Sequence, residues 1–278
     1  MTSIEGPKPF VKWAGGKRQL LDILVKESPD KFNNYYEPFL GGGALYFKLW
    51  SNDKIKKAFL NDSNAELVNT YKVIQKRVGE LVEELKTSKY KNNSTNYYEI
   101  RSKKLEDNIE RAARFIYLNK TAYNGLYRVN SNGGFNVPYG KYSNPKILDE
   151  DNLQLVNESL KNAKITCGDF KDIFSKTKKK DYAYFDPPYH PLTNGSFTKY
   201  TKNDFTSKDQ ERLQKCFTSL TKKKVYTMLS NSDTNYIQEL YKNHIISKVY
   251  ATRQINCKAD KRGKITELLI KGVDFNEI

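Results

Sequence analysis

The strongest constraint on the fold of this chain is Tyr182–Tyr189, where an apolar run meets an acid and two prolines. The run Tyr182–Phe185 predicts a buried strand that stops at Asp186. Pro187 and Pro188 exclude a central strand or a helix interior beyond this point, because proline lacks the N–H that either would need. We therefore expect Asp186 at the carboxyl edge of a sheet, where open α/β folds bind ligands.

The same segment indicates a kind of chemistry. Asp186 offers a carboxylate, Pro187 a rigidly placed carbonyl and Tyr189 an aromatic ring within four residues. Such a group can hold a planar ligand that carries an amino group. The alternative is an ordinary strand end with a proline turn and a surface aspartate, because a short motif is only a hypothesis.

Strands and helices are expected to alternate along most of the chain. The expected strands are Tyr35–Leu40, Ala58–Leu60, Lys164–Cys167, Tyr182–Phe185, Lys224–Leu229 and Glu267–Ile270. The expected helices cover Leu20–Val25, Ala44–Trp50, Ala65–Leu85, Ile109–Leu118 and Asp209–Leu220. This alternation predicts a three-layer, Rossmann-like α/β domain with a mostly parallel sheet. Residues 66–149 are expected to form an inserted, mainly helical module between the two parts of that domain, 1–65 and 150–278.

The charge and composition of the chain limit the classes of partner that we expect. The chain carries 48 Lys+Arg against 32 Asp+Glu, a formal charge of +16, which favours a polyanionic partner. A lysine-rich genome or a solubilising surface is the alternative. The 3 cysteines and 2 histidines lack metal-ligand spacing, and no run has the roughly 18 apolar residues of a membrane span. We therefore expect a cytoplasmic protein without a structural metal and without a membrane segment.

A glycine loop predicts a nucleotide-type ligand. Gly41 to Gly43 lie between an expected strand and helix, so the backbone can approach a ligand closely. The loop is neither a dinucleotide fingerprint nor a Walker sequence. Asp62 follows about 20 residues later, at a strand end where a carboxylate can bind both hydroxyls of a ribose. The alternative role for Asp62 is to cap the helix that starts at Ala65.

Three further residues are candidates for the same ligand. Asp169 ends another expected strand and can accept a hydrogen bond from an adenine amino group, although an ordinary turn aspartate fits equally. Trp13 can face a sulfonium by cation–π attraction, and Lys17 can hold a carboxylate. The alternative is a core tryptophan and a surface lysine.

The chain resembles the Dam-type DNA adenine methyltransferases, in particular the Dpn M-like enzymes of DpnII systems, which methylate GATC. The resemblance covers nearly the whole chain, and its motifs occur in the order of the family. These motifs are Phe10–Arg18, Tyr36–Ala44, Asn61–Asp62, Tyr123–Ser131, Phe135–Gly140, Asp186–Tyr189, Leu229–Ser232 and Arg262–Ile265.

The resemblance implies S-adenosylmethionine as cofactor, duplex DNA as substrate and a flipped adenine as the reacting base. Asp186 and the Pro187 carbonyl would accept the hydrogens of the adenine amino group, and Tyr189 would stack on the base. The implied cofactor contacts are Trp13, Lys17, Phe39, Gly41, Gly43, Asp62, Asp169 and Asp186. A cognate restriction endonuclease that makes no direct contact with this chain is a further implied partner.

The inserted module is expected to read the DNA. By the resemblance, Arg128 recognises a guanine of GATC, and Asn124, beside Tyr123, lies near the target base or its orphaned partner. Lys141 stands where the family usually carries arginine, which weakens the case for a bidentate contact there. Lys12 and Arg101 are candidate phosphate contacts. A glycine-rich surface loop without DNA contacts is the alternative for this segment.

Other functions remain open from the sequence. The Asp-Pro-Pro-Tyr chemistry also suits adenine in RNA or single-stranded DNA and, less well, cytosine N4. A DNA-binding protein that keeps the fold without activity is a different class, which intact Trp13, Lys17, Asp62 and Asp186 argue against. A nucleotide-dependent oxidoreductase is disfavoured because the dinucleotide fingerprint is missing.

Overall fold

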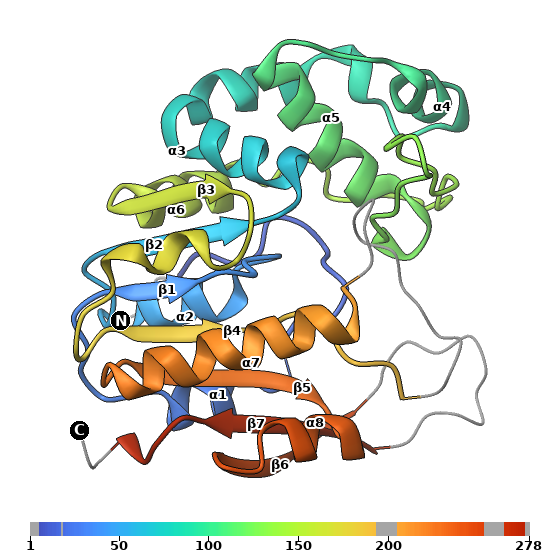
Figure 1. Cartoon of the computed structure of the whole chain (residues 1–278). Coiled ribbons are helices and arrows are strands. Elements are labelled where there is room, and N and C mark those ends of the chain that lie inside the picture. The colour runs from blue at the N-terminus through green and yellow to red at the C-terminus, as the bar shows by residue number, and fades with distance from the viewer. Residues whose placement is uncertain (1–5, 18, 193–204, 253–263, 276–278) are drawn as a thin grey trace.

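The computed structural model describes residues 6–17, 19–192, 205–252 and 264–275, and a seven-stranded sheet crosses this part of the chain (Figure 1). The strand order is β3-β2-β1-β4-β5-β7-β6. Strands β1 to β5 pair in parallel, whereas β7 runs antiparallel between β5 and β6. The strands are β1 (Tyr35–Glu37), β2 (Ala58–Asp62), β3 (Ala163–Cys167), β4 (Tyr182–Phe185), β5 (Tyr226–Ser232), β6 (Ile245–Thr252) and β7 (Lys264–Lys271).

The helices are α1 (Leu21–Glu27), α2 (Ala44–Ser51), α3 (Ala65–Lys86), α4 (Ser94–Ser102), α5 (Asn108–Thr121), α6 (Glu150–Leu160), α7 (Ser207–Lys222) and α8 (Asn235–Leu240). Short 3₁₀ turns lie at Ser88–Tyr90, Tyr123–Gly125 and Asp172–Lys176. The expected strands and helices are confirmed as elements, whereas α4, α6, α8 and β6 were not foreseen. The expected end of the first strand at Leu40 was wrong, because β1 ends at Glu37, directly before Pro38. The expected start of β5 at Lys224 was wrong, because Lys224 has a φ of 59° and belongs to the turn before the strand.

Two apolar cores lie on opposite faces of the sheet, which gives the three-layer α/β arrangement expected from the sequence. Along β4, Tyr182 and Tyr184 belong to one core, and Ala183 and Phe185 belong to the other. This alternation is the ordinary side-chain period of a strand, so a strand apolar at every position is buried on both faces. Helices α7 and α8 contribute to the second core.

The centre of the sheet is the place where the strand order reverses. From β1 the chain passes outward through β2 to β3, and it then returns to β4 on the other side of β1. The carboxyl ends of β1 and β4 are therefore neighbours whose connections leave in opposite directions. In open α/β sheets this switch point is where ligands bind.

Helix α3 joins the sheet to a lobe made of α4, α5 and residues 121–149 (Figure 1). The helix begins where the Asn64 side chain accepts hydrogen bonds from the N–H groups of Glu66 and Leu67. It packs on β2, β3 and α6 as well as on α5. Because α3 contacts both parts, the limits 66–149 for the inserted module stay a prediction.

Candidate active site and DNA interface

Lys17 and Asp186 form an ion pair at the switch point. Phe185, the last residue of β4, is fully buried and holds Asp186 at the carboxyl edge of the sheet. Lys17 Nζ lies 2.7 Å from Asp186 Oδ1, and it also donates to the Gly15 carbonyl at 2.8 Å. Only 6% of the Lys17 side chain is exposed, so the pair is largely withdrawn from water.

Two further acceptors lie at this strand end. Within the described ranges, no residue donates a hydrogen bond to Asp186 Oδ2 or to the Pro187 carbonyl. Burial raises the pKa of the Asp186 carboxyl, and the charge and hydrogen bond of Lys17 oppose that rise. Since Pro187 has no N–H, the dipeptide presents two acceptors side by side.

Tyr189 belongs to the same cluster. Lys17 Nζ lies 4.7 Å from the centroid of its ring, and the Tyr189 hydroxyl donates to Glu267 Oε2 at 2.6 Å. The structure thus brings Asp186, Lys17 and Tyr189 together, and it adds Glu267 from β7. Sequence reasoning missed Glu267, whose only signal was an acid directly before the apolar run Leu268–Ile270.

Asp62 closes the glycine loop from the end of β2. Its Oδ2 accepts from the Gly41 N–H and its Oδ1 from the Asn64 N–H, both at 2.9 Å. Burial raises the pKa of the Asp62 carboxyl, and these backbone hydrogen bonds oppose the rise. The alternative that Asp62 caps α3 is wrong, because Asn64 is the capping residue.

The glycine loop fits closely against Trp13. Gly41 has a φ of 48°, and a Cβ at this position would lie 2.7 Å from Cδ1 of Trp13, so no larger residue fits without a shift. Gly43 has a φ of 69° and precedes α2. The loop therefore depends on glycine at both positions, as expected for a backbone that approaches a ligand.

These residues fit S-adenosylmethionine. The Asp62 carboxylate keeps acceptor capacity beyond its two backbone hydrogen bonds, as ribose hydroxyls require. Glu37, 3% exposed at the end of β1, interacts electrostatically with Asp62, Asp186 and Lys17. The carboxylates of Asp62 and Asp186 at this edge of the sheet suit a cationic sulfonium.

Asp169 lies at the next strand end, beside Phe170, which packs against Phe39. Phe39 stacks on Phe170, with ring centroids 5.5 Å apart. Burial acts to raise the pKa of Asp169, but hydrogen bonds from Arg212, at 2.6 Å, and from the Lys171 N–H lower it overall. The adenine contact at Asp169 stays a prediction, and Arg212 is a partner that the sequence did not reveal.

Residues 121–142 form a strap that doubles back on itself through two antiparallel bridges. Across the strap, Arg128 Nε donates to Asn136 Oδ1 at 2.8 Å, and the Asn136 N–H donates to the Arg128 carbonyl at 3.0 Å. The Arg128 side chain is exposed. Nη2 of Arg128 also donates to the Asn136 carbonyl at 3.5 Å, and the guanidinium keeps further N–H groups for another partner.

The other predicted DNA contacts differ in their surroundings. Tyr123, Asn124 and Lys141 are exposed on the strap, and the last two have a φ of 54°. Arg101 is half-buried and donates from Nη1 to the Val137 carbonyl at 3.1 Å, so it holds the strap in place. A phosphate contact at Arg101 stays a prediction and would have to use its other N–H groups.

Lys12 lies between the glycine loop and the strap. The buried Asn119 side chain binds the Lys12 N–H and carbonyl at 2.7 and 2.8 Å. The exposed Lys12 side chain reaches the strap, where its Nζ lies 4.6 Å from the Tyr142 ring centroid. The predicted phosphate contact is thus fixed at its backbone by a residue that sequence reasoning missed.

Trp13 also contacts both the glycine loop and the strap. Its ring stacks on Tyr127 of the strap, with centroids 5.6 Å apart, and packs against Phe115 at 6.3 Å. Trp13 is half-buried, so core packing and a free edge are both present. The sulfonium contact of Trp13 stays a prediction.

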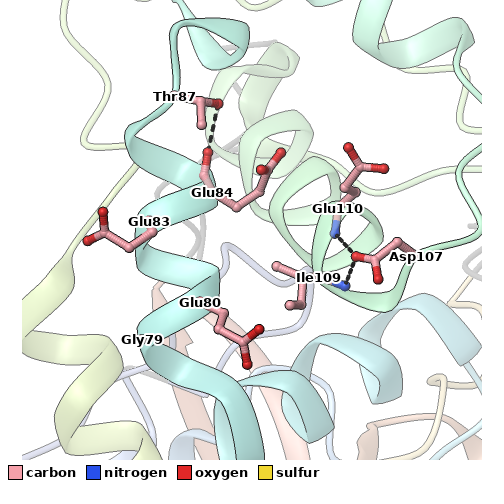
Figure 2. Close-up of a pocket in the computed structure, with 8 residues that line it drawn as sticks. All are labelled: Gly79, Glu80, Glu83, Glu84, Thr87, Asp107, Ile109 and Glu110. Atoms are coloured by element: carbon pink, nitrogen blue, oxygen red, sulfur yellow. Dashed lines mark hydrogen bonds between the residues drawn. The ribbon is translucent and has the colours of Figure 1, made fainter.

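A pocket of about 660 Å³ lies away from this edge, between the C-terminal part of α3 and the start of α5 (Figure 2). Its lining includes Glu80, Glu83, Glu84, Asp107 and Glu110. Four of these carboxylates pair with Arg77, Lys86 or Lys89.

The described residues give two negative findings. No helix among them is long and apolar enough to cross a membrane. No group of three or more His, Cys, Asp or Glu side chains in the same ranges could hold a metal ion. Arg18, Cys257 and Arg262 of the sequence analysis lie outside the described residues.

Comparisons with known proteins give one family. Residues 13–255 match the family model described as D12 class N6 adenine-specific DNA methyltransferase. A type II methyltransferase of Lactococcus lactis, M1.LlaDCHI, is 44% identical over 95% of this chain and 94% of its own. Another of Methanocaldococcus jannaschii, M.MjaIII, is 46% identical over 95% of this chain and 98% of its own. The DNA adenine methylase of Escherichia coli is 33% identical over 94% of each chain.

Proposed function

The chain belongs to the D12 class N6 adenine-specific DNA methyltransferases, and we propose that it acts at the adenine of GATC in duplex DNA. The activity of the family is transfer of a methyl group from S-adenosylmethionine to the N6 amino group of adenine in DNA. This confirms the predicted enzyme class and cofactor. The GATC site is supported by the motif resemblance described above.

The proposal for catalysis rests on one observation, the paired acceptors at the end of β4. Asp186 Oδ1 is held by Lys17, while Oδ2 and the Pro187 carbonyl remain available among the described residues. The N6 nitrogen of adenine is a poor nucleophile because its lone pair is delocalised into the ring. Two acceptors that bind its hydrogens localise this lone pair and aim it.

S-adenosylmethionine, when bound, supplies an electrophilic methyl group on its sulfonium. As the nitrogen forms its bond to the methyl carbon, the bond between that carbon and the sulfonium sulfur would break, and the sulfur would keep the electron pair as S-adenosylhomocysteine. The nitrogen would become positively charged, and Asp186 Oδ2 would stabilise that charge. The nitrogen would then release one proton to the carboxylate of Asp186. Burial, which raises the pKa of Asp186, favours this proton transfer.

Tyr189 serves as the stacking surface for the reacting base. An adenine inside a duplex cannot reach the edge of the sheet, so the base is flipped out at a cost of a few kcal/mol. The Tyr189 ring lies beside Asp186 and Lys17, where a flipped base would arrive. Stacking on this ring would compensate part of the lost stacking in the duplex.

The cofactor contacts are proposed from the same edge of the sheet. Asp62 would bind the ribose hydroxyls, and the backbone of Gly41 and Gly43 would let the ligand approach. The remaining proposed contacts are Trp13, Lys17, Phe39, Asp169 and Asp186.

For the DNA, we propose that residues 66–149 carry the recognition surface. Arg128 would read a guanine, and Tyr123 and Asn124 would lie near the target base or its partner. Lys12 and Arg101 would contact phosphates, Lys141 would contact the DNA without a bidentate fork, and the +16 charge supports such contacts. We also propose a cytoplasmic location. A cognate restriction endonuclease that does not contact this chain is a further proposed partner.

The proposal is tested by methylating a mixed pool of duplex DNA and sequencing the modified positions. We expect methylation at the adenine of GATC and at no other adenine. A different consensus would overturn GATC, and faster transfer to RNA or single strands would overturn the duplex substrate. Failure to bind S-adenosylmethionine would instead favour an inactive DNA-binding protein.

A further inference from the structure

The backbone that follows the catalytic dipeptide is held from two elements. Gln210 Nε2 of α7 donates to the Pro188 carbonyl at 2.9 Å. At the end of β5, Asn231 Oδ1 accepts from the His190 N–H at 3.1 Å, and Ser232 Oγ donates to the His190 carbonyl at 2.6 Å. The backbone on both sides of residue 189 is therefore fixed, and only the side chain of residue 189 remains to be oriented.

Glu267 fixes that side chain. The Tyr189 hydroxyl donates to Glu267 Oε2 at 2.6 Å, the length of a bond between a hydroxyl and a charged acceptor. Glu267 lies in the middle of β7, opposite Ser232 of β5 and Val249 of β6, so its own backbone is paired on both sides. A residue held in this way is a rigid anchor for the far end of the ring.

We propose that Glu267 is a positioning residue that sets the plane of the Tyr189 ring for the flipped adenine. A phenolic O–H lies in the plane of its ring, so an acceptor fixed on β7 favours one ring orientation as well as one position. Lys17 Nζ lies over one face of the ring, 4.7 Å from its centroid, so the base would stack on the opposite face. The role rests on the proposed function, in which Tyr189 stacks on the flipped base.

A second role for Glu267 predicts different results. Its charge also acts on Asp186, because the two carboxylates repel each other. If that repulsion were its contribution, the effect of removing Glu267 would not depend on the Tyr189 hydroxyl. A double-mutant cycle between residues 189 and 267 separates the two roles.

The test uses the full chain as wild type, Glu267→Leu, Glu267→Gln, Tyr189→Phe and the double variant Tyr189→Phe/Glu267→Leu. Single-turnover methylation at saturating S-adenosylmethionine gives the rate, and titration gives the cofactor KM. We expect Glu267→Leu to lower the rate about tenfold, the effect of one lost hydrogen bond to a charged acceptor, with KM unchanged. Glu267→Gln keeps an acceptor and should recover most of the rate. The exposed Glu239→Leu on α8 is the matched control and should match wild type.

The double variant should be no slower than Tyr189→Phe alone. An equal tenfold loss in the Tyr189→Phe background would assign Glu267 to its charge and overturn the positioning role. A parallel loss of cofactor affinity and thermal stability would make Glu267 merely structural, which also overturns it.

A duplex with 2-aminopurine in place of the target adenine gives a second measurement, since this base fluoresces when unstacked. Wild type should brighten it modestly, and Glu267→Leu should brighten it further because the flipped base stacks poorly. If wild type produces no change, base flipping itself is wrong and the role of Glu267 falls with it. If wild type brightens the duplex and Glu267→Leu matches it in both fluorescence and rate, only the role of Glu267 is overturned.

Discussion

Lys17 Nζ and Asp186 Oδ1 lie 2.7 Å apart at the switch point of the sheet, and the lysine cation acts on the ionisation of the carboxyl. Burial raises the pKa of the Asp186 carboxyl, and the Lys17 cation opposes this rise. The lysine therefore favours the ionised carboxylate in a place where burial alone would favour its protonation. In the proposed mechanism this carboxylate accepts an amino hydrogen away from water.

Replacing Lys17 with methionine should move the acid limb of the pH–rate profile to higher pH. Without the lysine nothing offsets burial, so the pKa of Asp186 rises further and the active ionised form is lost at a higher pH. Single-turnover rates at saturating cofactor over about pH 5 to 9 measure the shift. Lys179→Met, at an exposed lysine before β4, should leave the profile unchanged. An acid limb at the same pH in Lys17→Met and wild type would contradict the coupling.

Asp186→Ala should abolish methyl transfer and leave a folded protein. The variant loses the acceptor that aims the amino group, and losses of about 100-fold or more are usual for such groups. Removing the carboxylate also leaves the buried Lys17 without its partner in the ion pair, so the free energy of unfolding should fall. Asp186→Asn keeps an oxygen for Lys17 and separates the two effects, since it should be more stable than Asp186→Ala but still severely slowed. Undiminished methylation by Asp186→Ala, with exposed Asp151→Ala as control, would refute the catalytic assignment.

Tyr189→Ala should weaken catalysis more than cofactor affinity. Its ring lies against Lys17 and is proposed to carry the base, so its loss acts on the bound DNA and leaves the Asp62 side of the cofactor site untouched. Single-turnover rates and cofactor titration give the two quantities. A large rise in the cofactor dissociation constant at a normal rate would be the opposite result.

Arg128→Ala should relax discrimination at one base pair. A bidentate arginine–guanine contact is worth about 1–3 kcal/mol of discrimination, and the Asn136 hydrogen bond already steers this guanidinium. Methylation rates on duplexes substituted at each position of the site measure the loss. Lys12→Ala is the contrast, because a phosphate contact should weaken binding to all sequences equally. If Arg128→Ala lowered the methylation rate equally on every duplex, Arg128 would be a phosphate contact as well.

The sequence revealed the parts of this site that depend on local order. The apolar run before Asp186 and the prolines after it specify a strand end, and the distance from the glycine loop to Asp62 places both at one edge. Contacts between segments that are distant in the sequence could not be predicted. Glu267 contacts Tyr189 only because β7 runs antiparallel beside β5, and the sequence of β7 does not indicate which strand it pairs with. Arg212 beside Asp169 is a second example, since its helix could pack in many registers.

Glu37 gives a prediction about stability. Burial raises the pKa of the Glu37 carboxyl well above its ordinary value of 4.5; the Tyr35 hydrogen bond opposes this rise, and the nearby Asp186 adds to it. In the unfolded chain Glu37 ionises near its ordinary pKa, whereas in the fold it keeps its proton to higher pH. The folded state then binds more protons, so the free energy of unfolding falls as pH rises through this window, by at most about 1.4 kcal/mol per pH unit.

Glu37→Gln should remove that dependence. Glutamine keeps an oxygen for the Tyr35 hydroxyl, which donates to Glu37 Oε2 at 2.9 Å, and it has no proton to lose. Urea unfolding at a series of pH values should give equal stability for variant and wild type near pH 4, and a growing advantage for the variant toward pH 8. Exposed Glu158→Gln should follow the wild-type curve. Parallel curves for Glu37→Gln and wild type would mean that Glu37 is already ionised in the fold, and its burial would then have to be compensated by Lys17.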